Sequence, residues 1–305
     1  MTPEFIAFVN TRAIPAGLML IMFSMGLTLT LGHFALVLRR PVPVAAGLGG
    51  QLFLMPLLAL AIGFLFRLPP ELALGMFIIA ICPAGTTSNG LTFVGRGNVA
   101  LAVVLTALSS LVTIFTIPLL LSWALPHFLG SGGEVPTLSV PRTIMQLATI
   151  VVLPVAAGMV VRRLWPQLAD RVVPWLRPVA FIVLIGVIAF GVALSARMVW
   201  DNLLGVGPAV WVLNAAAMGV GLLLGRFVGA DRRDAMTLAI EVGVHNVTLA
   251  VFLTLTVLNS LPLALTQNIY GVVMLVNGML LVRWFRARLT ADGEGAAPAA
   301  AREAS

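Results

Sequence analysis

The stretch CPAGTTSNG, residues 82–90, lies in the middle of an otherwise apolar segment that runs from about 71 to 95. It contains one proline and two glycines, and it ends in four hydrogen-bonding side chains followed by the second glycine. Because proline removes a backbone donor and glycine weakens a helix, we expect the segment to break between Pro83 and Gly90. The break places polar side chains and freed backbone groups inside an apolar region.

The composition around this stretch is that of a membrane protein. Of 305 residues, 60% are hydrophobic and 10% are charged, whereas a soluble domain carries about 25% charged residues. The net charge of +7 does not indicate nucleic-acid binding, because all 18 basic residues are arginines in connections and at segment ends. The single cysteine, Cys82, excludes a disulfide framework. The sequence therefore predicts an all-α polytopic membrane protein.

Proline–glycine clusters and arginines divide the chain into nine apolar segments that are long enough to span a bilayer. We expect them at about 12–36, 42–66, 71–95, 98–126, 140–164, 172–197, 202–229, 234–260 and 262–287. Together they form one transmembrane domain over residues 1–287, with a disordered cytoplasmic tail at 288–305. The N-terminal stretch lacks the basic region of a signal peptide, so we expect the first helix to be retained.

The arginines also predict the orientation of the chain in a cell membrane. With the N-terminus outside, 14 of the 18 arginines fall on the cytoplasmic side. The four that remain outside are Arg12, Arg67, Arg142 and Arg197. Since cytoplasmic connections are enriched in positive charge, the count favours nine helices with the N-terminus outside and the C-terminus inside.

A second polar stretch, EVGVHN at 241–246, interrupts the segment at 234–260. The two interrupted segments are the third and the eighth, which are five segments apart. A five-helix unit crosses the membrane an odd number of times, so its second copy would be inverted. Interrupted helices at matching positions of inverted repeats indicate a transporter binding site near the bilayer midplane. Nine segments then correspond to two five-helix repeats of which the first lacks its opening helix.

Glu241 is the only acidic residue that lies well within an apolar segment. A carboxylate at the centre of a bilayer costs about 2.5–3.5 kcal/mol or more unless it is partnered. No arginine lies near the middle of an apolar segment to pair with it, which favours a bound cation as its partner. The alternative is a protonated, purely structural Glu241 that is hydrogen-bonded to a neighbouring helix.

Oxygen-bearing side chains around both breaks fit a hard cation, which prefers hydroxyl, amide and carbonyl oxygens. His245 follows Glu241 by four residues, so on an unbroken helix the two side chains share a face. It either relays protons or donates a hydrogen bond to the carboxylate. The candidate oxygen ligands are Gln51, Thr86, Thr87, Ser88, Asn89, Thr106, Ser109 and Ser110.

At these motifs the chain resembles the bile acid:sodium symporter family, in particular its bacterial members. The resemblance rests on IMFSMGLTL (21–29), GQLFLMP (50–56), CPAGTTSNGLTFVGRGNVAL (82–101) and EVGVHN (241–246), which occur in the family's order. It implies two discontinuous crossing helices, a core domain (42–126 and 202–287) and a panel domain (12–36, 140–164 and 172–197). It further implies sodium-coupled symport of an organic anion, bile-acid-like or a small carboxylate, by alternating access.

The resemblance also implies the site residues, with sodium ions as the coupling ions and no other cofactor. The first sodium site would be formed by Ser88, Asn89, Thr106 and Glu241. The second would be formed by Gln51, Glu241, the carbonyls of Val242 and Val244, and His245. The substrate would contact Thr86, Thr87 and Asn246, with Asn268 and Asn277 as further candidates.

Two positions depart from the family pattern and leave the coupling ion open. Ala102 replaces a serine ligand of the first site, and His245 replaces a glutamine of the second. A proton-coupled or uncoupled carrier of the same fold is therefore an alternative. A remote alternative is an intramembrane enzyme, for which Ser88 and His245 would be the only nucleophile–base pair.

Overall fold

The computed structural model describes residues 2–130, 138–194 and 196–291. Within these ranges the chain is helical, and its only β pairing is a single antiparallel bridge between Ala84 and His245. The all-α prediction is confirmed for this part of the chain. Of the predicted tail, residues 288–291 continue a helix, and residues 292–305 lie outside the described residues.

Seven helices in the described ranges are long and apolar enough to span a membrane. They are Pro3–Thr28, Pro41–Leu65, Val99–Leu129, Val140–Leu164, Pro166–Leu194, Ala196–Phe227 and Leu261–Arg288. The chain is thus polytopic. The two other predicted segments are each divided into shorter helices, so nine crossings stay a prediction.

The first predicted range, 12–36, is wrong at both ends. The helix begins at Pro3, where the Thr2 hydroxyl accepts from the Phe5 N–H, and it ends at Thr28. A separate helix, α3 (Leu31–Arg39), starts after Thr30, whose backbone N–H donates to the Nδ1 atom of His33 at 3.0 Å. Each of these capping contacts depends on one polar residue, and a hydropathy pattern does not locate a helix end that closely.

Three of the long helices contain a wide π-helical turn that ends two residues before a proline. The turns are η1 (Val9–Ala13), η2 (Gly50–Leu54) and η3 (Ala148–Val152), which precede α2 (Ile14–Thr28), α5 (Met55–Leu65) and α10 (Leu153–Leu164). Proline cannot donate and clashes with the carbonyl four residues earlier, and a π turn makes room for it without ending the helix. The turn η2 carries Gln51 and buries its side chain.

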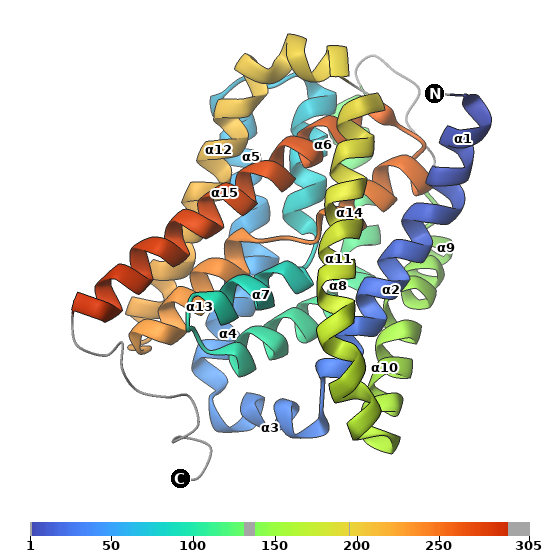
Figure 1. The fold of residues 1–305 in the computed structure, drawn as a ribbon. Coiled ribbons are helices and arrows are strands. Elements are labelled where there is room, and N and C mark those ends of the chain that lie inside the picture. The colour runs from blue at the N-terminus through green and yellow to red at the C-terminus, as the bar shows by residue number, and fades with distance from the viewer. Residues whose placement is uncertain (1, 131–137, 195, 292–305) are drawn as a thin grey trace.

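Both interrupted segments are broken, the first over fewer residues than predicted, because residues 86–90 are already helical. The third consists of α6 (Pro70–Ile81) and α7 (Thr86–Val94), joined by extended residues 82–85. The eighth consists of α13 (Arg232–Gly243), an extended link at 244–246, α14 (Val247–Val251) and the π-helical η4 (Phe252–Val257). In Figure 1 the two links meet near the middle of the bundle.

The remaining helices surround these breaks. Helix α2 packs against α10 and α11, and these three lie together on one side of the bundle (Figure 1). The other side contains the broken helices with α8, α12 and α15. The bounds of these and the other helices are α1 (Pro3–Phe8), α4 (Pro41–Gly49), α8 (Val99–Leu129), α9 (Val140–Leu147), α11 (Pro166–Leu194), α12 (Ala196–Phe227) and α15 (Leu261–Ala291).

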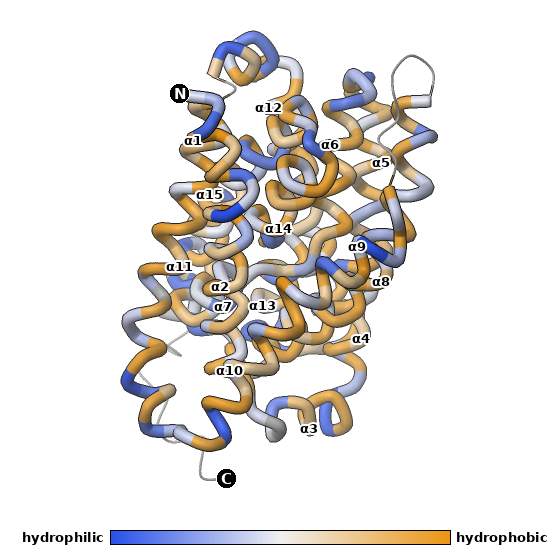
Figure 2. The backbone as a smooth tube through the Cα atoms, turned by 90° about the vertical axis from the view of Figure 1, so that its right-hand side faces the viewer, coloured by the Kyte–Doolittle hydropathy of each residue, from blue (hydrophilic) through white to orange (hydrophobic). Residues whose placement is uncertain are grey.

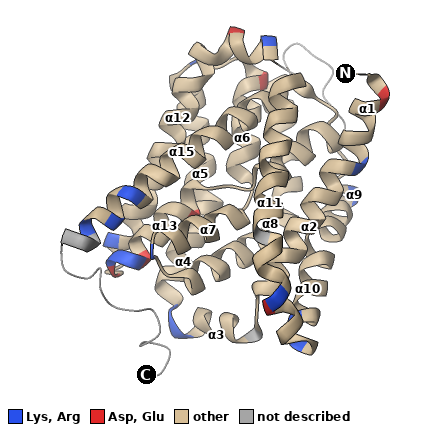
Figure 3. Ribbon diagram, in the orientation of Figure 1, with Lys and Arg blue, Asp and Glu red and all other residues tan. Residues whose placement is uncertain are grey.

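Polarity is distributed as a bilayer requires. Apolar residues predominate along the middle of the helices (Figure 2), and most of the charged residues lie toward the two ends of the bundle (Figure 3). Exposed large apolar side chains such as Phe64, Leu204 and Phe227 cover the outside, as expected where lipid is the solvent. Most of the buried polar side chains among the described residues belong to the broken helices or to α8, α12 and α15, which pack against them.

Candidate functional site

Backbone groups of the two breaks form hydrogen bonds with each other. The Asn246 N–H donates to the Pro83 carbonyl at 2.8 Å, and the Gly85 N–H donates to the Val244 carbonyl at 3.4 Å. These bonds flank the bridge between Ala84 and His245. Inside a membrane such pairing is needed, because freed backbone groups find no water in lipid. The crossing thus brings the end of α13 and the start of α7 to one place.

Glu241 lies in the last turn of α13 and is 0% exposed. Its Oε1 atom accepts from the Ser88 hydroxyl at 2.5 Å, and its Oε2 atom accepts from the Thr106 hydroxyl at 2.9 Å. None of the ion pairs among the described residues involves Glu241. The carboxylate is therefore held by two hydroxyls from α7 and α8 and has no basic partner in the described part of the chain.

The four predicted ligands of the first sodium site come together in the structure. Thr106 is 3.4 Å from the amide oxygen of Asn89 and 3.5 Å from the Ser88 hydroxyl. Carboxylate, hydroxyl and amide oxygens converge here, which is a donor set suited to a hard cation. Of the further candidates, Ser109 donates to the Thr106 carbonyl of its own helix at 3.2 Å.

The second predicted set is assembled differently. Gln51 donates from Nε2 to the backbone carbonyl of Glu241 at 3.1 Å, and its Oε1 atom is buried without a partner. The carbonyls of Val242 and Val244, however, already face protein donors. His245 Nε2 is 2.9 Å from the Val242 carbonyl. Because residue 245 offers ring nitrogens instead of an amide oxygen, this set is a less complete oxygen cage than the first.

His245 joins the two breaks and does not face Ser88. Its Nδ1 atom is 2.6 Å from the Cys82 carbonyl, so both ring nitrogens lie against backbone carbonyls. The Ser88 hydroxyl contacts the Gly85 carbonyl, Glu241 and Thr106. A nucleophile–base pair needs hydrogen-bonding contact between its two members. The geometry therefore gives no support to the enzyme alternative.

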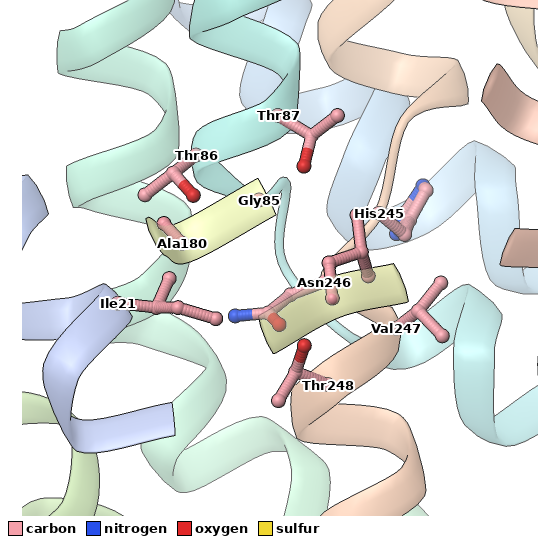
Figure 4. A pocket seen from close by; sticks show the side chains of 10 residues that line it. Ile21, Gly85, Thr86, Thr87, Ala180, His245, Asn246, Val247 and Thr248 are labelled. Carbon is pink, nitrogen blue, oxygen red and sulfur yellow. The ribbon is translucent and has the colours of Figure 1, made fainter. Parts of the chain in front are cut away.

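A small cavity opens beside the crossing. The breaks and α14 contribute polar atoms, and α2 and α11 contribute an apolar wall; Figure 4 shows the Asn246 amide extending toward Ile21 on α2. The lining residues are Ile21, Gly85, Thr86, Thr87, Ala180, Leu184, His245, Asn246, Val247 and Thr248. Three of the five predicted substrate contacts, Thr86, Thr87 and Asn246, line this cavity.

Positive helix ends and a free amide donor converge on the cavity. Asn246 uses its side-chain oxygen to cap α14 by accepting from the Leu249 N–H at 3.0 Å. Its Nδ2 group is buried and has no partner. Helix α7 begins at Thr86, which also lines the cavity. Helix N-termini carry partial positive charge, so the cavity is suited to an anionic group.

The other two predicted substrate contacts lie elsewhere. Asn268 packs into a notch at Gly191 of α11, where an added Cβ atom would lie 2.2 Å from its Nδ2 atom. Asn277 donates to the Asn214 side chain at 2.9 Å. Neither residue lines the cavity, because each side chain is held between packed helices.

The sequence analysis missed two residues that support the second break. Asn214 on α12 and Tyr270 on α15 both donate to the Gly243 carbonyl, at 2.7 Å and 2.8 Å. The Tyr270 ring also packs edge-on against His245. Each had a signal, since Asn214 is a lone amide in an apolar segment and Tyr270 is the only tyrosine in the chain.

Comparisons with known proteins identify the relatives of this chain. The family model described as "Sodium Bile acid symporter family" matches residues 15–202. The chain is 31% identical over 253 residues, or 83% of its length, to "Probable sodium/metabolite cotransporter BASS1, chloroplastic" of Arabidopsis thaliana, and covers 61% of that protein. It is 31% identical to "Uncharacterized sodium-dependent transporter YocS" of Bacillus subtilis, over 74% of this chain and 68% of the relative.

A mammalian relative is similar over most of the chain. The "Sodium-dependent organic anion transporter" of Rattus norvegicus is 31% identical over 92% of this chain and 75% of the relative. All three relatives are named as transporters, so the enzyme alternative is set aside. With the matched region covering more than half of its length, the chain belongs to the sodium bile acid symporter family.

Proposed function

We propose that this protein is a secondary active transporter that couples sodium to the movement of a small organic anion. The observation that supports it most is Glu241, a buried carboxylate surrounded by hydroxyl and amide oxygens with no basic partner among the described residues. A charge in this position needs a counter-ion, and a cation from solution is the one that the donor set suits.

Sodium would act by joining three helices. Ser88 and Asn89 belong to α7, Thr106 to α8 and Glu241 to α13. A cation bound by these oxygens would stabilise the arrangement in which both breaks meet. Because Thr86 and Asn246 border the same breaks, an ordered crossing also presents the substrate contacts. Sodium binding would thereby raise the affinity for the substrate, because both ligands would stabilise the same conformation. Gln51 and the carbonyls of Val242 and Val244 stay candidates for a second sodium.

The cavity supports a small anion as the substrate. Polar contacts from Thr86, Thr87 and Asn246 suit a carboxylate, and Ile21 with Leu184 suits a short apolar part. A carboxylate with an apolar part therefore suits this lining. Asn268 and Asn277 would act through packing and not by substrate contact.

Transport would proceed by alternating access between a core and a panel. The cavity lies between the breaks of the proposed core and helices α2 and α11 of the proposed panel. Movement between these two groups would open the cavity to one side of the membrane at a time. We place the protein in the cell membrane with nine crossings, the N-terminus outside and the C-terminus inside, from the arginine distribution.

Uptake into proteoliposomes tests this function. Small radiolabelled carboxylates would be screened with a sodium gradient and with choline in place of sodium, at a fixed pH on both sides. We expect at least one carboxylate to accumulate only with sodium. Full uptake in choline would contradict sodium coupling.

A proton-coupled carrier is the second candidate, and the His245 geometry favours it. Carbonyl oxygens only accept, so simultaneous hydrogen bonds to Cys82 and Val242 need a proton on both ring nitrogens. A charged imidazole would then occupy the place of a second cation. Imposing an inward proton gradient in choline distinguishes the candidates, because accumulation under that condition alone supports proton coupling and its absence contradicts it.

A further inference from the structure

A second buried carboxylate lies at the beginning of α13. The side chain of Asp234 is 1% exposed. Its Oδ1 atom accepts from the Asn98 side-chain amide at 2.8 Å, and its Oδ2 atom pairs with Arg40 at 2.7 Å. In the sequence Asp234 stands at the end of an apolar segment, where an acidic residue is usually exposed. Instead it joins α13 to the residue that starts α8 and to the residue that precedes α4.

Asn98 contacts α13 and also caps α8. Its backbone N–H donates to the Thr237 hydroxyl at 2.9 Å, and its side-chain oxygen caps α8 by accepting from the Leu101 N–H at 3.0 Å. The preceding turn lies directly on α13, since a Cβ atom at Gly97 would be 2.8 Å from the Thr237 hydroxyl. The sequence GRGN at 95–98 is therefore built to hold the α7–α8 turn against α13.

The junction and the cation site share one face of α13. Asp234, Thr237 and Glu241 have the spacing i, i+3, i+7, which places them on the same side of a helix over about 10 Å. On α8, Asn98 and Thr106 are eight residues apart and contact the same face of α13. The two helices are thus joined at two levels, Asn98 with Asp234 and Thr106 with Glu241. Figure 1 shows α7, α8 and α13 packed together beside α4.

We propose that Asp234 is a positioning residue for the cation site. Its contacts with Asn98 and Arg40 fix the register of α13 against the α7–α8 turn, which keeps Glu241 within reach of Ser88 and Thr106. Asp234 touches none of the predicted ligands, so it acts only through helix placement. The inference rests on the proposed sodium site, and it predicts that loss of the junction weakens sodium binding without removing any ligand.

The test compares variants by the sodium concentration that gives half-maximal thermal stabilisation and half-maximal uptake. Asp234→Asn keeps the side-chain shape and removes the charge. We expect its sodium midpoint to rise on the order of tenfold, the size of effect seen when residues behind metal ligands are replaced. Uptake at saturating sodium should return close to the wild-type rate, because the ligands themselves are intact.

Two further variants complete the test. Asn98→Ser keeps a capping side chain for α8 but loses the amide donor to Asp234, so its sodium midpoint should rise in the same direction. If Asp234→Asn does not fold, the sodium midpoint of Asn98→Ser tests the proposal in its place. The matched control is Asp201→Asn, whose carboxylate is exposed and lies 4.0 Å from Arg197; its midpoint should equal that of the wild type.

The outcomes separate this inference from the proposed function. Variants that unfold at a lower temperature but keep the wild-type sodium midpoint would show a purely structural junction and overturn the positioning role. A wild-type protein that does not respond to sodium would contradict the cation site itself, and the positioning role with it.

Discussion

The two broken helices of this protein break for different reasons. The first contains its own breakers, Pro83 and Gly85, and its link is satisfied by the main chain and His245 of the second. The second has only Gly243, whose carbonyl accepts from Asn214 on α12 and Tyr270 on α15. One break is thus encoded locally and the other is held by neighbouring helices. Where the two breaks cross, Glu241 of the second broken helix contacts Ser88 of the first.

The largest effect is expected where the two breaks meet. Glu241→Ala removes the carboxylate that the proposed cation would neutralise, and it leaves the apolar segments that direct membrane insertion. We predict that sodium-dependent uptake falls to background while the purified protein stays monodisperse. The matched control is Glu71→Ala, since Glu71 is exposed in the first turn of α6. Near-normal coupled uptake by Glu241→Ala would contradict the account.

A smaller effect should follow from removing a support of the second break. Asn214→Ala deletes one donor to the Gly243 carbonyl and leaves the Asn277 amide without its acceptor. Hydrogen bonds between membrane helices contribute about 1 kcal/mol, so we expect a loss of roughly 2–4 °C in Tm. The control is Asn202→Ala, whose amide bonds only to its own helix. Equal Tm values for both variants would show that the second break does not depend on α12.

The smallest effect is predicted at the contact that joins the breaks. His245→Gln replaces a ring that lies against the Val242 carbonyl with an amide that supplies an oxygen. We expect a modest decrease, about twofold to fivefold, in the sodium concentration for half-maximal thermal stabilisation, because oxygen suits a hard cation better than imidazole. An unchanged or higher midpoint would count against a second cation position at His245.

Much of this architecture could be predicted from local sequence. Pro83 and Gly85, two residues apart and followed by polar side chains, weaken a helix locally, and the arginine-flanked apolar segments correspond closely to most of the observed helices. The first helix was misplaced because single capping residues, Thr2 and Thr30, decide its ends. The ligands on the first break could be recognised because consecutive hydroxyl and amide side chains are rare in an apolar segment.

The rest depended on contacts between distant segments. Asp234 looks like a residue at a solvent-facing helix end, and only the packing of Asn98 and Arg40 around it shows that it is buried. The family resemblance makes Asn268 and Asn277 candidate substrate contacts, whereas in this structure their side chains lie against Gly191 and Asn214. The apolar cavity wall, with Ile21 and Leu184, carries no signal that distinguishes it from lipid-facing residues.

Direct binding of radioactive sodium to the purified protein tests the central claim, a cation held by the buried carboxylate. Binding would be measured at fixed pH for the wild type, for Glu241→Gln and for the exposed control Glu71→Gln. The account predicts saturable binding to the wild type and the control, and none at the first site in Glu241→Gln. Equal binding by all three proteins, or no saturable binding to the wild type, would contradict it.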